Sequence, residues 1–362
     1  MLISDVEIQN FRNYNYEKIK LNSNINIFFG DNAQGKTNIV EAIFLSAFGK
    51  SFRTSKEKEL IKIGENFSNI NISYKNQSRD GVVKIQLSDK KSISVNGIKL
   101  KKLSELLGNI NVVLFTPDDI NILKDGPAGR RRFLDMMIGQ IRPNYVYNLN
   151  MYLKTLEQRN NYIKQINKTQ NINEDMFDIW DEKLTEYGVK ISNYRLEFIN
   201  KIKEKIKNIH NEITENKEDI EIEYITDSLN REKLLSLYKE RRKLDLIKGY
   251  TTKGVQRDDF VIYINGKPVN VYGSQGQHRT SVLSLKLCEL DIIKEEISEN
   301  PILLLDDFMS ELDEKRIKNF LKHIKNTQVI ITCTKNIEEE NVEKSVFYVN
   351  NGKIENFKKE VK

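Results

Sequence analysis

A glycine-rich octapeptide, placed between an apolar run and a helical pattern, most constrains how this chain can fold. Residues 30–37 read Gly-Asp-Asn-Ala-Gln-Gly-Lys-Thr and fit the phosphate-loop pattern G-x-x-x-x-G-K-[ST]. Residues 25–29 predict a strand before this loop, and residues 37–48 carry apolar side chains at helical spacing after it. The alternative is a chance match in an ordinary strand-turn-helix, which the two flanks make less probable. The sequence therefore predicts a binding site for ATP or GTP.

Each residue type in this loop has a chemical reason. Gly30 and Gly35 let the backbone wrap closely around phosphate with its N–H groups pointing inward. The helix N-terminus adds partial positive charge. Lys36 can reach the β- and γ-phosphates, and the Thr37 hydroxyl can ligate Mg²⁺. The residues assigned to ATP binding are Gly30, Asp31, Asn32, Ala33, Gln34, Gly35, Lys36 and Thr37.

A second apolar run, residues 302–305, leads directly into Asp306 and Asp307. Continuous apolar residues favour a buried parallel strand, and ligands of open α/β sheets lie at the carboxyl ends of such strands. We expect Asp306 to hold Mg²⁺ through water, and Asp307 to orient or deprotonate the attacking water. The alternative is a helix N-cap whose neighbour is solvated.

The segment Ser274-Gln275-Gly276-Gln277 precedes an apolar helix and could form an anion site at its N-terminus. Taken alone this pattern is weak, because a helix cap with nothing bound would also explain it. Before it, residues 260–264 and 269–272 are expected to pair as strands across an Asn265-Gly266 turn.

Composition adds limits. The 362 residues are 39% hydrophobic and 30% charged, with a net charge of +6 and two cysteines, Cys288 and Cys333, not spaced as C-x-x-C. This pattern is typical of a globular protein with reduced thiols, and we expect a cytoplasmic protein with no membrane span. The predicted class is α/β, with an ATPase lobe at 1–110 and 250–362 and a mainly helical lobe inserted at 111–249. A second helix of more than thirty residues is expected in the insert.

The order of the motifs resembles the ABC-type P-loop ATPases, whose heads pair in a sandwich. The resemblance makes Ser274, Gly276 and Gln277 the signature motif, which would contact the ATP of a second chain. It makes Asp306 the Walker B acid, and it places a D-loop at 310–313, with Ser310 and Asp313 as its site residues. It implies an ATP-dependent homodimer, with Lys36 and Asp307 as catalytic residues and ATP and Mg²⁺ as cofactors.

A closer resemblance, from end to end of the chain, is to the RecF family of bacterial DNA repair proteins. It rests on segments 8–14, 30–38, 116–119, 130–135, 274–280 and 304–307, and it extends the ATP-binding residues to Asn38. The chain departs from the family at Val255 and Gln256, where Pro and His are usual, and at His278, where Gln is frequent. Asp307 stands where ABC-type ATPases usually have a catalytic Glu, and in this it resembles the RecF family. Its shorter carboxylate implies slow turnover.

The resemblance implies an ATP-dependent DNA-binding protein of recombinational repair and replication that acts at gapped DNA, supports recombinase loading and the SOS response, and has recombination-mediator proteins as partners. It implies a weak DNA-dependent ATPase, with ATP-driven dimerisation and release of DNA, at single-strand/duplex junctions, after hydrolysis. Candidate phosphate contacts on DNA are Lys50, Arg53, Arg130, Arg131, Arg132, Arg241 and Arg242, each of which has an ordinary ion-paired or surface role as its alternative.

Three other functions are alternatives to this one. A transporter ATPase would not carry a helical insertion between Lys36 and Ser274. A structural SMC-like tether would need longer heptad arms than this chain has. An SMC-like or other ABC-type DNA repair ATPase with a different partner remains the alternative.

Overall fold

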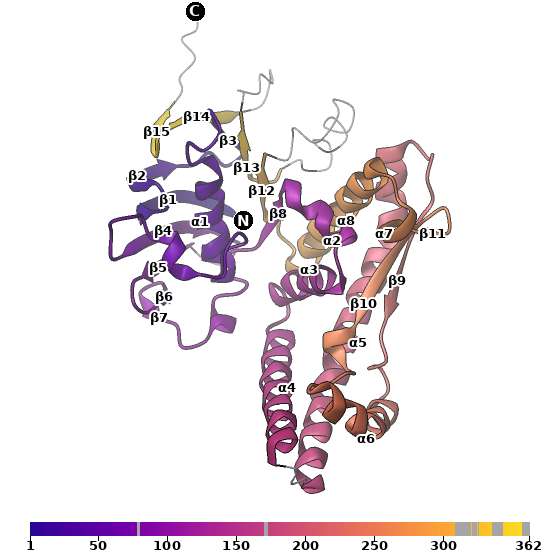
Figure 1. Cartoon of the computed structure of the whole chain (residues 1–362). Helices are drawn as coiled ribbons and strands as arrows, with labels where there is room; N and C mark the ends of the chain where they lie inside the picture. Colours follow the sequence, from indigo (N-terminus) through magenta and orange to yellow (C-terminus); the bar gives the residue numbers. More distant parts are fainter. Residues whose placement is uncertain are drawn as a thin grey trace, which may run out of the picture. The chain divides into compact units, whose positions relative to one another are not determined.

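The computed structural model describes residues 1–77, 80–169, 173–307, 320, 324, 326–334 and 343–356. These residues form two compact units, one of residues 1–119 with 289–362 and one of residues 120–288 (Figure 1). We call them the nucleotide unit and the helical unit. The chain enters the helical unit once and leaves it once, so the helical unit is an insertion into the nucleotide unit.

The nucleotide unit contains a six-stranded sheet in the order β15-β14-β3-β13-β12-β8, in which all neighbours are parallel except β15 and β14. Its strands are β3 (Ile25–Phe29), β8 (Val112–Phe115), β12 (Ile302–Asp306), β13 (Val329–Cys333), β14 (Lys344–Asn350) and β15 (Lys353–Asn356). Strands β8 and β12 are buried throughout, as expected where a parallel sheet is covered on both faces.

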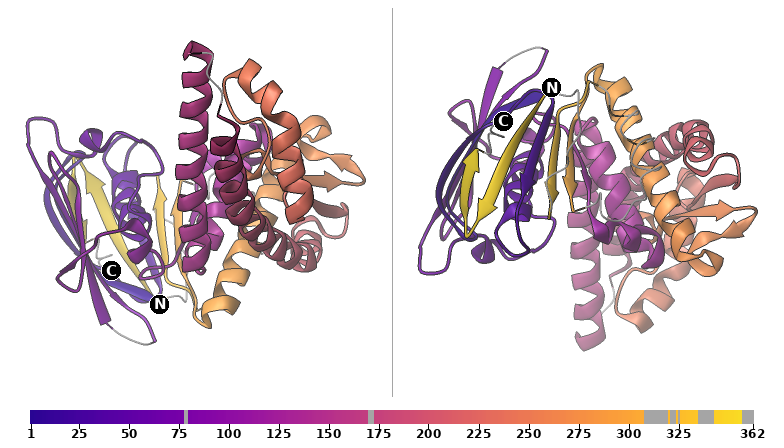
Figure 2. Two further views of the ribbon diagram at one scale, coloured as in Figure 1. Left: turned by 90° about the horizontal axis from the view of Figure 1, so that it is seen from below. Right: turned by 90° about the horizontal axis from the view of Figure 1, so that it is seen from above.

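A second, antiparallel sheet runs in the order β2-β1-β4-β5-β6-β7. Its strands are β1 (Leu2–Phe11), β2 (Tyr14–Lys20), β4 (Ser68–Lys75), β5 (Asp80–Leu87), β6 (Ser92–Val95) and β7 (Ile98–Lys99). Burial alternates along β4, so one face packs inward. Helix α1 (Lys36–Phe48) contacts strands of both sheets and lies between them (Figure 2). Residues 36 and 39–48 are therefore buried almost all round the helix.

The helical unit contains two long helices that pack side by side, α4 (Pro143–Thr169) and α5 (Glu174–Thr214) (Figure 1). Its other helices are α2 (Asn121–Lys124), α3 (Pro127–Gly139), α6 (Arg231–Lys248), α7 (Val269–Tyr272) and the start of α8 (Gln275–Ile297). A three-stranded antiparallel sheet, β11-β10-β9, completes it, with β9 at Ile220–Ile225, β10 at Asp259–Ile264 and β11 at Lys267–Pro268. The predicted helix of more than thirty residues is α5.

In the described residues, four short 3₁₀ helices connect these elements. They lie at Glu57–Leu60, Leu103–Glu105, Pro117–Ile120 and Val255–Arg257.

The strand predicted at residues 269–272 is wrong. The Asn265-Gly266 turn forms, with both residues at positive φ, but β11 pairs with β10 at only two positions. Pro268 then stands at the N-cap of α7. Proline has no backbone N–H to continue the ladder and its φ suits the first turn of a helix, so the strand ends there.

The α/β class with an inserted, mainly helical lobe is confirmed. The compact units, however, do not begin and end where the predicted domains do, because β10 pairs with β9 along its whole length and keeps residues 259–264 in the helical unit. The predicted division into an ATPase lobe, residues 1–110 with 250–362, and a mainly helical inserted lobe, residues 111–249, stays a prediction. Among the described residues, no helix is long and apolar enough to cross a membrane.

A buried guanidinium joins three helices of the helical unit. Arg159 of α4 is fully buried; its Nε donates to Asp181 of α5 at 2.8 Å, and one of its terminal nitrogens donates to Asp245 of α6 at 2.7 Å and to Thr251 at 2.7 Å. Asp181 also pairs with Arg242 at 2.7 Å, so the two buried carboxylates are matched by two guanidinium groups.

Replacing Arg159 with alanine should lower the free energy of unfolding by about 3–5 kcal/mol, because Asp245 would be left buried without its cation and Asp181 would keep only Arg242. Urea denaturation followed by circular dichroism measures this. The matched control is Lys190→Ala, which breaks an exposed pair with Glu186 on α5 and should cost no more than about 0.5 kcal/mol. Equal effects of the two substitutions would contradict the role given to Arg159.

Candidate nucleotide-binding site

Three neighbouring parallel strands end at one edge of the sheet. Strand β13 lies between β3 and β12, with Thr332 opposite both Phe28 and Asp306. The glycine-rich loop follows β3, and Asp307 follows β12. The register therefore brings the loop and the two aspartates, about 270 residues apart in the chain, to the same edge, where open α/β sheets bind ligands.

The backbone of the loop depends on glycine at both ends. Gly30 has φ 152° and Gly35 has φ 117°. A Cβ atom at Gly30 would lie 2.3 Å from the Val349 carbonyl oxygen, and one at Gly35 would lie 2.7 Å from the Asn13 side chain. No other residue fits these positions without moving its neighbours. Gly35 is also the N-cap of α1, so the loop ends at the positive end of that helix dipole.

Lys36 folds back over the loop. Its side-chain nitrogen donates to the carbonyl oxygens of Gly30 at 2.7 Å and Asp31 at 2.8 Å, and the residue is 4% exposed. The ammonium group is thus held beside the curled backbone where a phosphate-binding loop requires positive charge.

A pair of hydroxyl groups surrounds Asp306. Its Oδ1 accepts hydrogen bonds from Thr37 Oγ1 at 2.8 Å and from Thr332 Oγ1 at 2.7 Å. Burial raises the pKa of Asp306, and these two hydrogen bonds oppose that shift. A hydroxyl and a carboxylate at contact distance are hard oxygen ligands of the kind that Mg²⁺ takes beside nucleotide phosphates. The residues present therefore fit a magnesium ion, which Thr37 and Asp306 would hold.

Asp307 has a backbone conformation that few residues adopt. Its φ is 48°, in the left-handed region, and its N–H donates to Thr332 Oγ1 at 3.0 Å. Such strained residues gather at functional sites, where surrounding contacts hold them in place. Thr332 thus contacts both aspartates, a role that sequence patterns did not indicate. The next residue, Cys333, has its pKa raised to about 11 by burial, so its thiol stays protonated at neutral pH.

The turn between β1 and β2 supports the loop from one side. Asn13 Nδ2 donates to the Gln34 carbonyl oxygen at 2.8 Å, and Tyr14 Oη donates to the Gly35 carbonyl oxygen at 3.0 Å. Asn38 Nδ2 in turn donates to Asn13 Oδ1 at 2.8 Å. The Asn-Phe-Arg-Asn-Tyr segment that carried part of the family resemblance is therefore a support for the loop.

A buried carboxylate on α1 anchors two arginines beside the loop. Glu41 is fully buried and receives a two-pronged ion pair from Arg12, at 2.8 and 2.7 Å. Arg53 approaches the same carboxylate at 3.3 Å and donates to Asn38 Oδ1 at 2.8 Å. Ser51 also donates to Glu41. This cluster fixes the segment after α1 against the loop, since bidentate arginine–carboxylate pairs set geometry as well as charge.

The hairpin formed by β14 and β15 contacts the loop at Gln34. The backbone N–H of Asn351 donates to Gln34 Oε1 at 2.7 Å, and that of Gly352 donates to the Gln34 carbonyl oxygen at 3.1 Å. The loop is therefore held from both ends of the chain.

The signature segment lies in the helical unit, at the start of α8. Ser274 Oγ accepts the Gln277 N–H at 3.2 Å, and Gln277 Oε1 accepts the Ser274 N–H at 2.9 Å. This is a reciprocal capping box. Ser274 and Gly276 are exposed, which is what contact with a second molecule requires. Ser310 and Asp313, predicted for the D-loop, lie outside the described residues.

The arginines and lysine predicted to contact DNA differ in how firmly other residues hold them. Arg130 makes four hydrogen bonds, two of them to Asp259, and Arg242 pairs with Glu174, Asp178 and Asp181. For these two the geometry favours the structural alternative. Arg53 is exposed although it is tied to Glu41, and Arg131, tied to the Asp258 carbonyl oxygen, is half-buried. The other exposed candidates are Lys50, Arg132 and Arg241.

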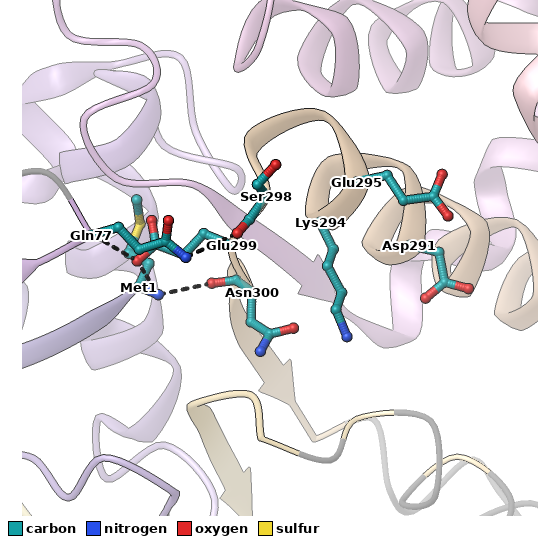
Figure 3. Close-up of a pocket in the computed structure, with 8 residues that line it drawn as sticks. All are labelled: Met1, Gln77, Asp291, Lys294, Glu295, Ser298, Glu299 and Asn300. Carbon is teal, nitrogen blue, oxygen red and sulfur yellow. Dashed lines mark hydrogen bonds and ion pairs between the residues drawn. The ribbon is translucent and has the colours of Figure 1, made fainter.

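A separate cavity of about 670 Å³ lies in the nucleotide unit beside the end of α8 (Figure 3). It is lined by Met1, Gln77, Asp291, Lys294, Glu295, Ser298, Glu299 and Asn300. None of residues 30–38 lines this cavity, so it is distinct from the glycine-rich loop.

Comparison with known proteins agrees with this geometry. The model of the RecF/RecN/SMC N-terminal domain family matches residues 2–355. Among curated proteins, the DNA replication and repair protein RecF of Clostridium acetobutylicum is 46% identical over 98% of this chain and 99% of its own length. The RecF of Alkaliphilus oremlandii is 42% identical over 98% of this chain and all of its own.

Solved structures add the fold. A structure of the recombination mediator protein RecF with ATP, in the RecFOR pathway, has a TM-score of 0.92 at 38% identity and covers 98% of this chain and 97% of that one. An Smc head bound to the C-terminal winged-helix domain of ScpA has a TM-score of 0.60 at 17% identity, covers 99% of this chain and 98% of that one, and shows the shared fold alone. The chain belongs to the RecF family of DNA replication and repair proteins, within the RecF/RecN/SMC class of ATPase heads. The predicted family and ABC-type head are confirmed.

Replacing Asp306 with asparagine should raise the unfolding temperature by a few degrees at pH 7, without nucleotide or metal. Burial raises the pKa of Asp306 in the folded chain, so the ionised carboxylate destabilises that chain above its folded pKa and the cost falls as pH drops through it. Asparagine can still accept from both threonine hydroxyls. Differential scanning fluorimetry tests this, with Asp118→Asn, an exposed carboxylate of the same unit, as control. A lower unfolding temperature would contradict the expectation.

Asn13→Ala should weaken ATP affinity about fivefold to tenfold, because a net hydrogen bond contributes about 1 kcal/mol and this side chain makes two to the loop and its helix. Titration calorimetry measures the Kd. Asn69→Ala removes a comparable side-chain bond to Gln9 on the antiparallel sheet and should leave the Kd unchanged. The same Kd in both variants would remove the supporting role of Asn13.

Proposed function

We propose that this protein is an ATP-driven switch that binds DNA during recombinational repair and replication. The observation that carries the proposal is the hydrogen bond between Thr37, at the end of the glycine-rich loop, and Asp306, at the end of β12. This contact supports the proposal because it joins the predicted phosphate-binding loop to the carboxylate predicted to hold Mg²⁺. A RecF relative of 38% identity is described with ATP, and the relatives named above are DNA replication and repair proteins.

The nucleotide would bind along residues 30–38. Inward backbone N–H groups and the start of α1 receive its phosphates, and Lys36 would exchange its two carbonyl partners for β- and γ-phosphate oxygens. Thr37 and Asp306 would hold Mg²⁺, which when bound neutralises the charge that develops on the transferred phosphoryl group. Asn38, held by Asn13 and Arg53, extends this contact surface.

Hydrolysis would use Asp307, one residue beyond Asp306. Its left-handed backbone, anchored by Thr332, sets a second carboxylate next to the metal-holding one. From there it can accept a proton from an attacking water, as a general base. Aspartate reaches less far than glutamate, which supports a weak ATPase whose product is a change of state; stimulation by DNA is part of the proposal.

ATP would join two chains head to tail. The signature residues Ser274, Gly276 and Gln277 of one chain would face the ATP bound to the other, so that each nucleotide needs both copies. The exposed capping box at the start of α8 supports this, since a helix N-terminus with an available hydroxyl is an anion site. Ser310 and Asp313 of the predicted D-loop would complete the contact.

The paired chains would bind DNA near single-strand/duplex junctions and release it after hydrolysis. Lys50, Arg132 and Arg241 are the exposed cations that best suit phosphate contacts. Arg53, exposed but paired with Glu41, and the half-buried Arg131 could add to them. Recombination-mediator proteins would be partners at gapped DNA, with recombinase loading and the SOS response as the outcome, in the cytoplasm. The alternative is another ABC-type DNA repair ATPase function with a different partner.

Light scattering with and without ATP and Mg²⁺ tests the switch. The wild-type chain should be a monomer that becomes a dimer with ATP, and Lys36→Ala should remain a monomer at the same ATP concentration because the phosphates lose their cation. Lys99→Ala, an exposed lysine on β7, is the control and should dimerise normally. Circular dichroism checks that each variant folds.

A wild-type chain that stays monomeric at high ATP, even with gapped DNA present, would overturn the head-to-tail sandwich. Dimerisation of Lys36→Ala equal to wild type would instead overturn the role of the loop.

A further inference from the structure

The signature residue Gln277 is held at both ends of its amide group. Oε1 accepts the Ser274 N–H at 2.9 Å, and Nε2 donates to Glu218 Oε1 at 3.0 Å. Glu218 lies in the segment between α5 and β9. A rotated amide would set its N–H₂ group against the Ser274 N–H and its oxygen against the carboxylate, and both contacts would be repulsive. Glu218 therefore selects one orientation of the Gln277 side chain.

That orientation decides what Ser274 can do. With Gln277 Oε1 holding the Ser274 backbone, Ser274 Oγ accepts the Gln277 N–H at 3.2 Å. Because the oxygen accepts inside the cap, its own proton is available to an acceptor outside the helix. An exposed serine hydroxyl at the N-terminus of a 23-residue helix is then a donor for an anion.

A buried histidine supports Glu218 from behind. Glu218 Oε2 lies 3.2 Å from Nε2 of His210, which is fully buried near the end of α5, and His210 Nδ1 lies 2.9 Å from Ser284 Oγ on α8. Burial lowers the pKa of His210. The neutral imidazole can donate from Nε2 to Glu218 and accept at Nδ1 from Ser284, whose one hydroxyl proton then turns from the Thr280 carbonyl oxygen, 2.9 Å away, to the ring.

These contacts close a ring. It starts at Gln277, passes through Glu218 and His210, and returns to α8 at Ser284, about two helical turns further on. An ordinary cap needs no such ring: α5 and α6 are each capped by one asparagine side chain, Asn173 and Asn230. The additional carboxylate and imidazole hold the first turns of α8 against the end of α5.

We propose that Glu218, supported by His210, is the positioning residue of the signature segment. It sets Ser274 and Gln277 in the arrangement that receives the phosphate oxygens of ATP bound to a second copy of this chain. The second copy and its ATP rest on the proposed function above. Glu218 acts through Gln277 and does not itself touch the nucleotide.

Hydrogen exchange in the nucleotide-free chain tests the positioning without any dimer. Glu218→Ala should speed amide exchange over residues 274–280 at least tenfold. Glu218→Gln should exchange like wild type, because its amide oxygen still accepts from Gln277 and its N–H₂ group can donate to His210 Nε2 in the other tautomer. Glu221→Ala, an exposed carboxylate on β9, is the matched control. Unchanged exchange in Glu218→Ala overturns the proposal.

Self-association with ATP tests the consequence. Glu218→Ala should raise the dimer Kd about tenfold and leave the ATP affinity of the monomer unchanged, because its own phosphate loop is intact; Glu218→Gln should restore the wild-type dimer Kd. The double variant Glu218→Ala/Gln277→Ala should be no weaker than Gln277→Ala alone. Additive losses would overturn action through Gln277.

A purely structural role would also predict that Glu218→Ala weakens ATP binding to the monomer, and that result too would overturn the proposal. If the wild type does not associate with ATP while Glu218→Ala still speeds exchange, the head-to-tail function falls and the anchoring of Gln277 by Glu218 stands.

Discussion

The hydrogen bond between Thr37 and Asp306 is the contact on which the rest of the nucleotide unit depends. It joins residues 269 positions apart, and it forms only because β13 separates β3 from β12 in the correct register. Other groups of the site hold either Thr37 or Asp306 in place. Thr332 holds Asp306 and the backbone of Asp307, while glycines at positive φ deliver Thr37 to the first turn of α1. Burying the Asp306 carboxylate destabilises the folded chain, and a bound cation would offset this. Functional sites often keep such destabilising groups, whereas stable cores do not.

The loop itself is supported by parts of the chain that carry no phosphate chemistry. The β1–β2 turn holds the Gln34 and Gly35 carbonyl oxygens, and the terminal hairpin holds Gln34 from the other side. Buried Glu41 fixes Arg12 and Arg53 next to them. A site that must release and rebind its ligand needs such pre-organisation, because each donor must already point at the phosphate before it arrives.

The helical unit places its charges differently. Two of its buried cations, Arg159 and Arg195, are each matched by carboxylates from other helices or segments. Pairs of this kind hold helices at a defined angle, since a mismatch would leave a buried charge uncompensated. The contact at the start of α8 is of another kind: Glu218 accepts from Gln277 and faces the buried imidazole of His210, whose pKa burial lowers.

The chain's local patterns determined much of this protein. Three local motifs indicated an ABC-type ATPase and its family: the glycine-rich loop, the apolar run before Asp306 and Asp307, and the S-x-G-Q segment. They could do so because a phosphate-binding strand-loop-helix is formed by consecutive residues. Only the tertiary structure decided which cations are held in ion pairs, as for Arg130 and Arg242, and which remain exposed, as for Arg132. It alone revealed Thr332, Glu41 and Glu218, and it turned the expected strand at 269–272 into a helix. The physical reason is that the partner of a side chain usually lies far away in sequence, so periodicity and composition do not reveal which residue that partner is.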